Sequence, residues 1–141
     1  MAEFTGVLLQ EVAANANVLF TETPVRSGSG AVVHREGSGI VTLRGCANQY
    51  RALYKVTFGA NVAIPEGGTV GPISLALAVE GEPLASATMI VTPTVAEAFF
   101  NVFTAALIAV TCDCCATIGV RNIGPDPVDV QNANLIVERV A

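Results

Sequence analysis

The sequence predicts an all-β protein, an antiparallel jelly-roll sandwich of about nine or ten strands with an apolar N-terminal arm. Three observations lead to this fold class. Apolar and polar side chains alternate with a period of two over residues 73–80 and again over 50–58. Clusters of glycine and proline, such as residues 65–68 and 124–127, separate these runs. No segment shows a long helical period.

Shorter runs between the turn signals predict the remaining strands. The last of these runs changes parity, because Val128 and Val130 lie on one side and Leu135 and Val137 on the other. A β-bulge near Gln131 would reconcile the two halves. In chain order, the shorter strands are expected at residues 18–23, 31–35, 40–44, 87–92, 116–121 and 128–140.

The chain of 141 residues has the length of one domain. We expect residues 17–141 to form the jelly roll and residues 1–16 to precede it as the arm. Hydrophobic residues make up 52% of the chain and charged residues only 13%, against an average of about 25% charged in soluble domains. So little charge favours an assembly that buries apolar surface between subunits.

The sequence argues against two kinds of partner, nucleic acid and a membrane. Its net charge is −5 and Lys55 is its only lysine, so nucleic acid is not an expected partner. The longest apolar run, residues 98–112, is shorter than the ~20 residues that a membrane helix needs, and we expect no membrane insertion. The N-terminus shows no basic start, apolar stretch or cleavage site, and we therefore expect no signal peptide.

The strand expected at residues 98–110 is apolar on both of its sides, whereas one side of a sandwich strand usually meets water. The second side needs a cover. Either a loop or the arm of the same chain covers it, or a neighbouring subunit does so at a symmetry axis. We predict the second, with an interface made of Phe99, Phe100, Phe103, Ala105, Leu107 and Ala109.

The N-terminal arm is itself apolar and needs a docking site. It can pack on its own subunit, or it can complete an open sheet edge of a neighbour and so propagate a filament. In the second case, deletion of residues 1–12 would abolish long assemblies and leave the domain folded. The residues expected to dock are Phe4, Val7, Leu8, Leu9 and Val12.

Three of the four cysteines cluster at one turn. Cys112, Cys114 and Cys115 follow the two-sided apolar strand, and Cys46 stands apart. Zinc sites usually pair cysteines two residues apart, and no histidine is near in sequence. A disulfide within or between subunits, reduced packing thiols and a metal site remain the three interpretations, in that order of preference.

Residues for catalysis are scarce. His34 is the only histidine and lies in a strand-like run, where a surface histidine or one with its hydrogen bonds satisfied is expected rather than a catalytic base. The chain contains no nucleophile elbow and no phosphate loop. Asp126 and Asp129 flank a proline and are weak candidates for calcium ligands. We expect no catalytic residue, no metal, no cofactor and no enzyme activity.

The order of five segments resembles the compact jelly rolls of the complement and tumour-necrosis-factor superfamily, and more closely the C-terminal heads of bacterial collagen-like glycoproteins of the spore exosporium. This resemblance implies a homotrimer held by an apolar axis, without shared catalytic residues. No collagen Gly-X-Y tract precedes the domain in this sequence. The matching segments are residues 17–21, 39–43, 54–58, 73–81 and 130–137.

Together these observations predict a non-enzymatic structural subunit that assembles with itself, as a trimer or a filament. The expected place is the extracellular surface of a spore exosporium, a cell or a phage particle, reached by lysis of the producing cell. The alternative is a head domain that binds a host receptor or a glycan through exposed loops at residues 27–30 and 65–68.

Overall fold

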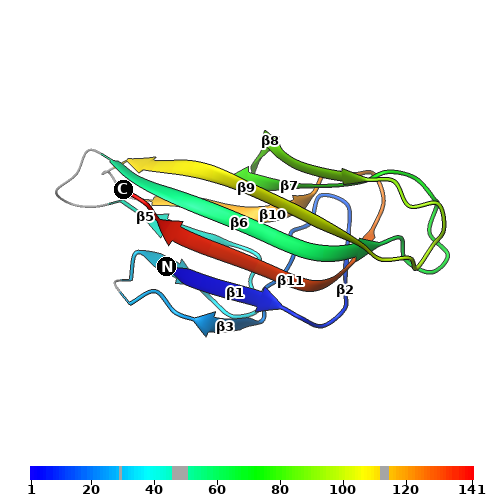
Figure 1. Cartoon of the computed structure of the whole chain (residues 1–141), viewed down its shortest axis with the longest axis horizontal. Coiled ribbons are helices and arrows are strands. Elements are labelled where there is room, and N and C mark those ends of the chain that lie inside the picture. The colour runs from blue at the N-terminus through cyan, green and yellow to red at the C-terminus, as the bar shows by residue number, and fades with distance from the viewer. Residues whose placement is uncertain (29, 46–50, 112–114) are drawn as a thin grey trace.

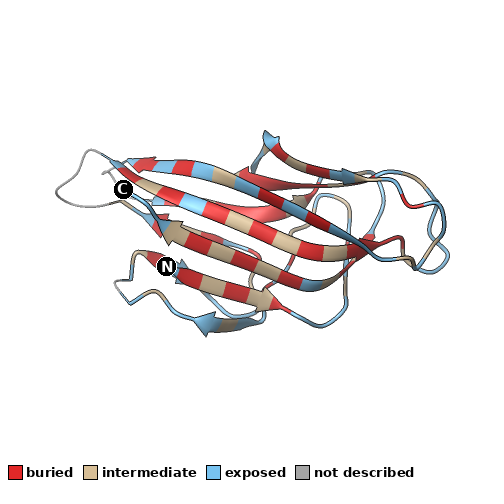
Figure 2. Cartoon of the chain, in the orientation of Figure 1, coloured by how far each residue is buried: buried red, intermediate tan, exposed pale blue. Residues whose placement is uncertain are grey.

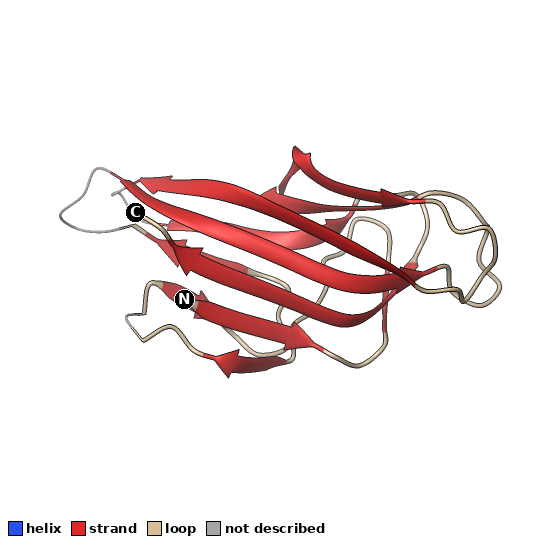
Figure 3. Ribbon diagram, in the orientation of Figure 1, coloured by secondary structure: helices blue, strands red, loops and turns tan. Residues whose placement is uncertain are grey.

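The computed structural model describes residues 1–28, 30–45, 51–111 and 115–141. These residues form two antiparallel sheets packed face to face (Figure 1). They contain eleven strands and no helix (Figure 3). The predicted all-β jelly roll is thereby confirmed, with slightly more strands than expected.

The first sheet has the strand order β3-β1-β11-β6-β9, and β2 pairs with β11 outside this path. The second sheet has the order β4-β5-β10-β7-β8. The strands of the first sheet are β1 (Ala2–Gly6), β2 (Gln10–Val12), β3 (Glu22–Val25), β6 (Arg51–Ala63), β9 (Phe100–Thr111) and β11 (Val128–Arg139). Those of the second are β4 (Val32–His34), β5 (Val41–Arg44), β7 (Ile73–Val79), β8 (Glu82–Val91) and β10 (Cys115–Asn122).

The core lies between the sheets, and burial alternates along the long strands (Figure 2). Tyr54 and Phe58 point inward from β6 and are fully buried. The Tyr54 hydroxyl donates a hydrogen bond of 2.7 Å to the carbonyl of Arg44, which satisfies its buried polar atom. Phe20 packs edge-to-face on Phe58 at 6.3 Å between ring centroids.

Residues 17–20 do not form the strand that was expected at 18–23. The Val18 amide donates to the Val120 carbonyl in the second sheet, whereas the Thr21 amide donates to the Thr5 carbonyl in the first. The segment therefore crosses from one sheet to the other, and Val18 and Phe20 fill the core on the way, whereas Leu19 is exposed. The strand in this region, β3, begins only at Glu22.

The bulge expected in the last strand is present. The pairing of β11 with β6 shifts register between Gln131 and Asn134. Asn132 has a φ of 57°, in the left-handed region that asparagine tolerates better than most residues.

The segment expected to be an arm is built into the first sheet. β1 lies between β3 and β11 and pairs with β11 from Ala2 to Gly6. The sequence carries a signal for this strand, because Ala2 and Phe4 face the core while Glu3 and Thr5 lie on the other side. That alternation covers only five residues, and the first strand expected from the sequence begins after it, at residue 18.

Two contacts hold the rest of this segment against its own chain. The side chain of Gln10 donates to the carbonyl of Leu19 and accepts from the amide of Leu19, both at 2.9 Å. Gly6 passes so close to this backbone that a Cβ atom there would lie 2.6 Å from the Leu19 oxygen. A residue larger than glycine would therefore force the two segments apart.

Candidate subunit interface

β9 is an edge strand without the usual protection of an edge. It pairs with β6 over its whole length, from Phe100 opposite Val62 to Thr111 opposite Arg51, without a register shift. On its other side no strand pairs with it among the described residues. In natural proteins, charged residues, proline or a bulge usually keep an edge strand from pairing with another chain. β9 contains none of these.

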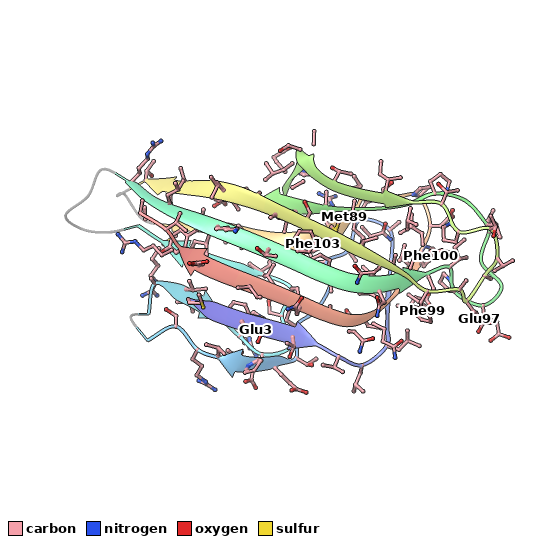
Figure 4. The ribbon with its side chains drawn as sticks, in the orientation of Figure 1. Glu3, Met89, Glu97, Phe99, Phe100 and Phe103 are labelled. Carbon is pink, nitrogen blue, oxygen red and sulfur yellow. The ribbon has the colours of Figure 1, made fainter. Side chains whose placement is uncertain are left out.

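The outward side of β9 is apolar and open to solvent. Phe103 and Leu107 are each 64% exposed, and Ala105 and Ala109 between and beyond them are exposed as well. Figure 4 shows Phe103 on the front of the strand, away from the second sheet. Within the described part of the chain, the N-terminal segment and the loops therefore leave this side uncovered.

The other predicted interface residues lie where β9 begins. Phe99 and Phe100 are 43% and 40% exposed, and Figure 4 shows them next to the loop that carries Glu97. Phe100 has the parity of the core-facing residues of β9. Burial on that side begins with Val102.

The outward face of the first sheet continues from β9 across its neighbours. Ala105 lies opposite Thr57 of β6, which lies opposite Ile136 of β11, and the latter two are half-buried. Leu107 lies opposite Lys55, which in turn lies opposite Glu138. On β9, β6 and β11 the row through Ala105 is therefore uncharged, and Lys55 and Glu138 lie side by side in the next row.

A row of asparagine side chains crosses the same face beside Phe103. Asn101 of β9 donates its side-chain amide to the side-chain oxygen of Asn61 at 3.2 Å. Asn61 of β6 donates to the side-chain oxygen of Asn132 on β11, also at 3.2 Å. We call these three residues the amide ladder. In the next row, Asn134 donates to a carboxylate oxygen of Glu3 at 3.1 Å.

The residues of the predicted arm divide into two groups. Phe4 and Val12 are buried in the core of their own chain. Val7, Leu8 and Leu9 lie in the connection between β1 and β2 and are exposed, Leu8 by 80%. Docking of these three on a neighbour stays a prediction.

The loops at one end of the sandwich enclose a cleft of about 300 Å³. One wall is the loop after β6, which includes Pro65, Gly67 and Gly68. The other is the turn after Asn122, whose buried side-chain amide donates to the carbonyls of Val12 and Asp126. The predicted loop 65–68 therefore lines a concave surface. Of the other predicted loop, residues 27–30, the structure describes all but residue 29.

Several carboxylates gather near this end. Asp129 lies directly opposite Glu11 in the pairing of β11 with β2. Partial burial, and after it the charges of Glu11 and Glu97, raise the pKa of Asp129 above its ordinary value. In the described residues, no group of three or more acidic, histidine or cysteine side chains has a geometry that could hold a metal ion.

Replacing Asp129 with asparagine is expected to stabilise the protein at neutral pH. Because the folded state binds this proton more tightly than the unfolded state, ionisation of Asp129 costs folding free energy, and stability falls as pH rises through its raised pKa. Asp129→Asn should therefore raise Tm at pH 7, with a gain that shrinks towards about pH 3. Thermal melts across this range test it. Asp126→Asn, an exposed neighbour, is the control, and an equal gain there would contradict the expectation.

His34 is partly buried, with one ring nitrogen hydrogen-bonded and the other without a partner among the described residues. It ends β4, and its Nε2 atom lies 2.8 Å from the carbonyl oxygen of Ser38. Its ring packs against Phe4 at 4.7 Å between centroids. The Nδ1 atom is buried and has no hydrogen-bond partner among the described residues.

Of the four cysteines, Cys115 lies within the described residues. It is the first residue of β10 and lies opposite Arg44 of β5. Cys46, Cys112 and Cys114 lie outside the described residues. The expected disulfide role of the four cysteines stays a prediction.

The described residues contain no helix with the length and apolar character to cross a membrane.

Solved structures with the same fold include those of three animal proteins. The globular domain of zebrafish complement 1qA matches with a TM-score of 0.69 and 12% identity, over 99% of this chain and 96% of that one. Eiger TNF from S. frugiperda matches with a TM-score of 0.73 and 16% identity, over 99% and 91%. Murine APRIL matches with a TM-score of 0.54 and 13% identity, over 95% and 97%.

The chain therefore has the jelly-roll fold of complement C1q and tumour-necrosis-factor domains. No protein-family model matches the sequence, and no curated protein matches it. At these identities the comparisons establish the fold. The narrower resemblance to exosporium glycoprotein heads stays an expectation.

Proposed function

We propose that this protein is a non-enzymatic structural subunit that assembles with itself through β9. The observation that carries the proposal is the open side of this strand, where Phe103 and Leu107 are each 64% exposed on an edge without protective charge. Full burial of such side chains contributes roughly 1.5–3 kcal/mol each. The small Ala105 and Ala109 beside them leave room for a neighbouring backbone.

A closed homotrimer is the form that the resemblance to complement and tumour-necrosis-factor jelly rolls implies, and an open filament is its rival. Sedimentation velocity at micromolar concentration, together with electron microscopy of the purified protein, tests the proposal. A discrete particle of three subunits supports the trimer, and fibres support the filament. A single monomer species would contradict self-assembly altogether.

The proposed location is an extracellular surface, that of a spore exosporium, a cell or a phage particle. Two features of the sequence support a durable outer layer: its low charge and its four cysteines. Disulfides formed after release into an oxidising environment would reinforce such a layer. Electrophoresis with and without reductant tests bonds between subunits, and a monomer band under both conditions would argue against them.

The second candidate function is recognition of a host receptor or a glycan through the loops. The cleft of about 300 Å³ beside Pro65 and Gly68 favours it, because ligand sites are concave and of similar size. Replacing residues 65–68 with a serine-glycine loop should abolish adhesion to host cells if the loop binds, and should leave assembly unchanged. Full adhesion by the loop variant would exclude this role for the loop.

A further inference from the structure

Hydrogen bonds hold both walls of the cleft of about 300 Å³ in place. In one wall, the amide of Gly68 donates to the carbonyl of Pro65 at 2.9 Å and closes the turn between them. In the other, the side-chain oxygen of Asn122 accepts from the amide of Gly124 at 3.0 Å, in addition to the two bonds that its own amide donates. The cleft is therefore formed before a ligand arrives, which lowers the cost of binding.

The lining of the cleft is largely apolar. Three residues of the core reach it, namely Ile64, Ile73 and Val128, and three prolines accompany them at positions 65, 72 and 127. Among the described residues, the lining has no aromatic side chain on which a sugar ring would stack. A volume of about 300 Å³ is at the lower end of the range for ligand sites, about 300–1,000 Å³, and suits one long side chain better than an oligosaccharide.

Every charged side chain that lines the cleft in the described part of the chain is acidic. Glu66 belongs to the wall after β6, Asp126 to the turn before β11, and Glu11 to β2. No lysine, arginine or histidine of the described ranges lines the cleft beside them. A cation inside the cleft would therefore be attracted from both walls, whereas an anion would be repelled.

Further carboxylates next to the cleft strengthen this negative potential. Asp129 lies opposite Glu11, and the backbone amide of Glu97 donates to the carbonyl of Ile64 at 2.8 Å. Partial burial is the first cause of the raised pKa of Asp129, and the charges of Glu11 and Glu97 are the second and third. The acidic groups at this end therefore already repel one another, and a cation would relieve that repulsion.

We infer that the cleft receives one arginine or lysine side chain from an exposed segment of a protein partner. The carbon chain of that residue is expected to lie on the apolar lining, with its charged end beside the carboxylates of Glu66 and Asp126. Long cationic side chains commonly divide in this way between apolar surface and water. The inference rests on the second proposed function, recognition through the loop at residues 65–68, and names the chemistry of the partner.

Peptides that differ in one side chain test the inference on the full chain. The first probe is a short serine-glycine peptide with one central arginine, blocked at both ends and carrying an uncharged fluorescent label. The second has lysine at this position, and the third has citrulline, which keeps the shape of arginine without its charge. In fluorescence anisotropy we expect saturable binding of a cationic peptide, and binding at least about fivefold weaker for the citrulline peptide.

Two paired variants locate the binding. Glu66→Gln with Asp126→Asn removes one exposed carboxylate from each wall. This pair should weaken binding of the arginine peptide at least about fivefold and leave the citrulline peptide within about twofold, so that the difference between the peptides disappears. Glu22→Gln with Glu82→Gln is the matched control, because it removes the same charge from two exposed residues outside the lining. It should leave both peptides within about twofold of wild type.

The outcomes separate the inference from the function on which it rests. Arginine and lysine peptides that bind no more tightly than the citrulline peptide would overturn the inference, and this comparison needs no variant to fold. Equal weakening by the control pair would also overturn it, because the attraction would then come from the net charge of the chain. If adhesion depends on residues 65–68 while the peptides show no preference for a cation, recognition by the loop stands and the inference alone is wrong. If the loop replacement leaves adhesion unchanged while the paired cleft variant still selectively weakens the arginine peptide, the site stands without a role in adhesion.

Discussion

Replacing Leu107 with aspartate is expected to convert the assembled protein into monomers. In the proposed assembly this side chain is buried against a neighbour, and a carboxylate there would have to leave water, which costs several kcal/mol. Since about 1.4 kcal/mol corresponds to a tenfold change in affinity, we expect the half-dissociation concentration to rise about a hundredfold or more. Sedimentation velocity over a concentration series measures this, and Phe103→Asp should behave in the same way.

The same substitution should leave the monomer folded. Leu107 is exposed in the single chain, and its cross-strand neighbour is Lys55, which would face the new carboxylate. Thermal melts should therefore change little. Val33→Asp is the matched control, because Val33 is an exposed apolar residue of β4, at an edge of the other sheet. Assembly that survives Leu107→Asp and Phe103→Asp unchanged would rule out β9 as the interface.

Deleting residues 1–6 is expected to unfold the domain rather than to release an arm. The deletion removes β1, which holds five consecutive pairs with β11 and is the only strand that pairs with β3 among the described residues. It also removes Phe4 from the core, where loss of a phenylalanine side chain alone costs about 3–5 kcal/mol. The total stability of a domain is about 5–15 kcal/mol.

The measurement is far-ultraviolet circular dichroism with a thermal melt, and we expect the folded baseline to be absent at 25 °C. Leu8→Ser with Leu9→Ser is the control, because these two side chains are exposed and β1 remains intact. A cooperative melt near the wild-type Tm in the deletion variant would show that β1 is dispensable. For the same reason, deletion of residues 1–12 is no longer expected to leave a folded domain.

Local patterns in the sequence were sufficient to predict the fold class and the two-sided apolar character of β9, the strand of the proposed interface. The period of two over residues 73–80 and 50–58 corresponds to β7 and to much of β6, and the parity change in the last strand is the bulge beside Asn132. The second apolar side of β9 could also be predicted from the sequence, because Phe103, Ala105 and Leu107 alternate with core residues. These features depend on neighbours in sequence, since side chains two apart share a face.

Sequence reasoning failed where long-range pairing decides the structure. Residues 2–6 carry a short alternation, but their place between β3 and β11 depends on a partner about 130 positions away. Residues 18–20 are apolar like a strand, yet they cross between the sheets. Short apolar segments are compatible with several partners, and packing selects among them.

By itself, then, the sequence determined that this chain is a β-sandwich. It also determined that one strand is apolar on both sides, so that its outward side needs a cover. Only the tertiary structure decided that this strand is an unprotected edge and that the N-terminal segment is part of the sheet. Only the tertiary structure, too, aligned Asn101, Asn61 and Asn132 into a ladder. The physical reason is that alternation sets which way a side chain faces, whereas sheet order and register set what lies beside it.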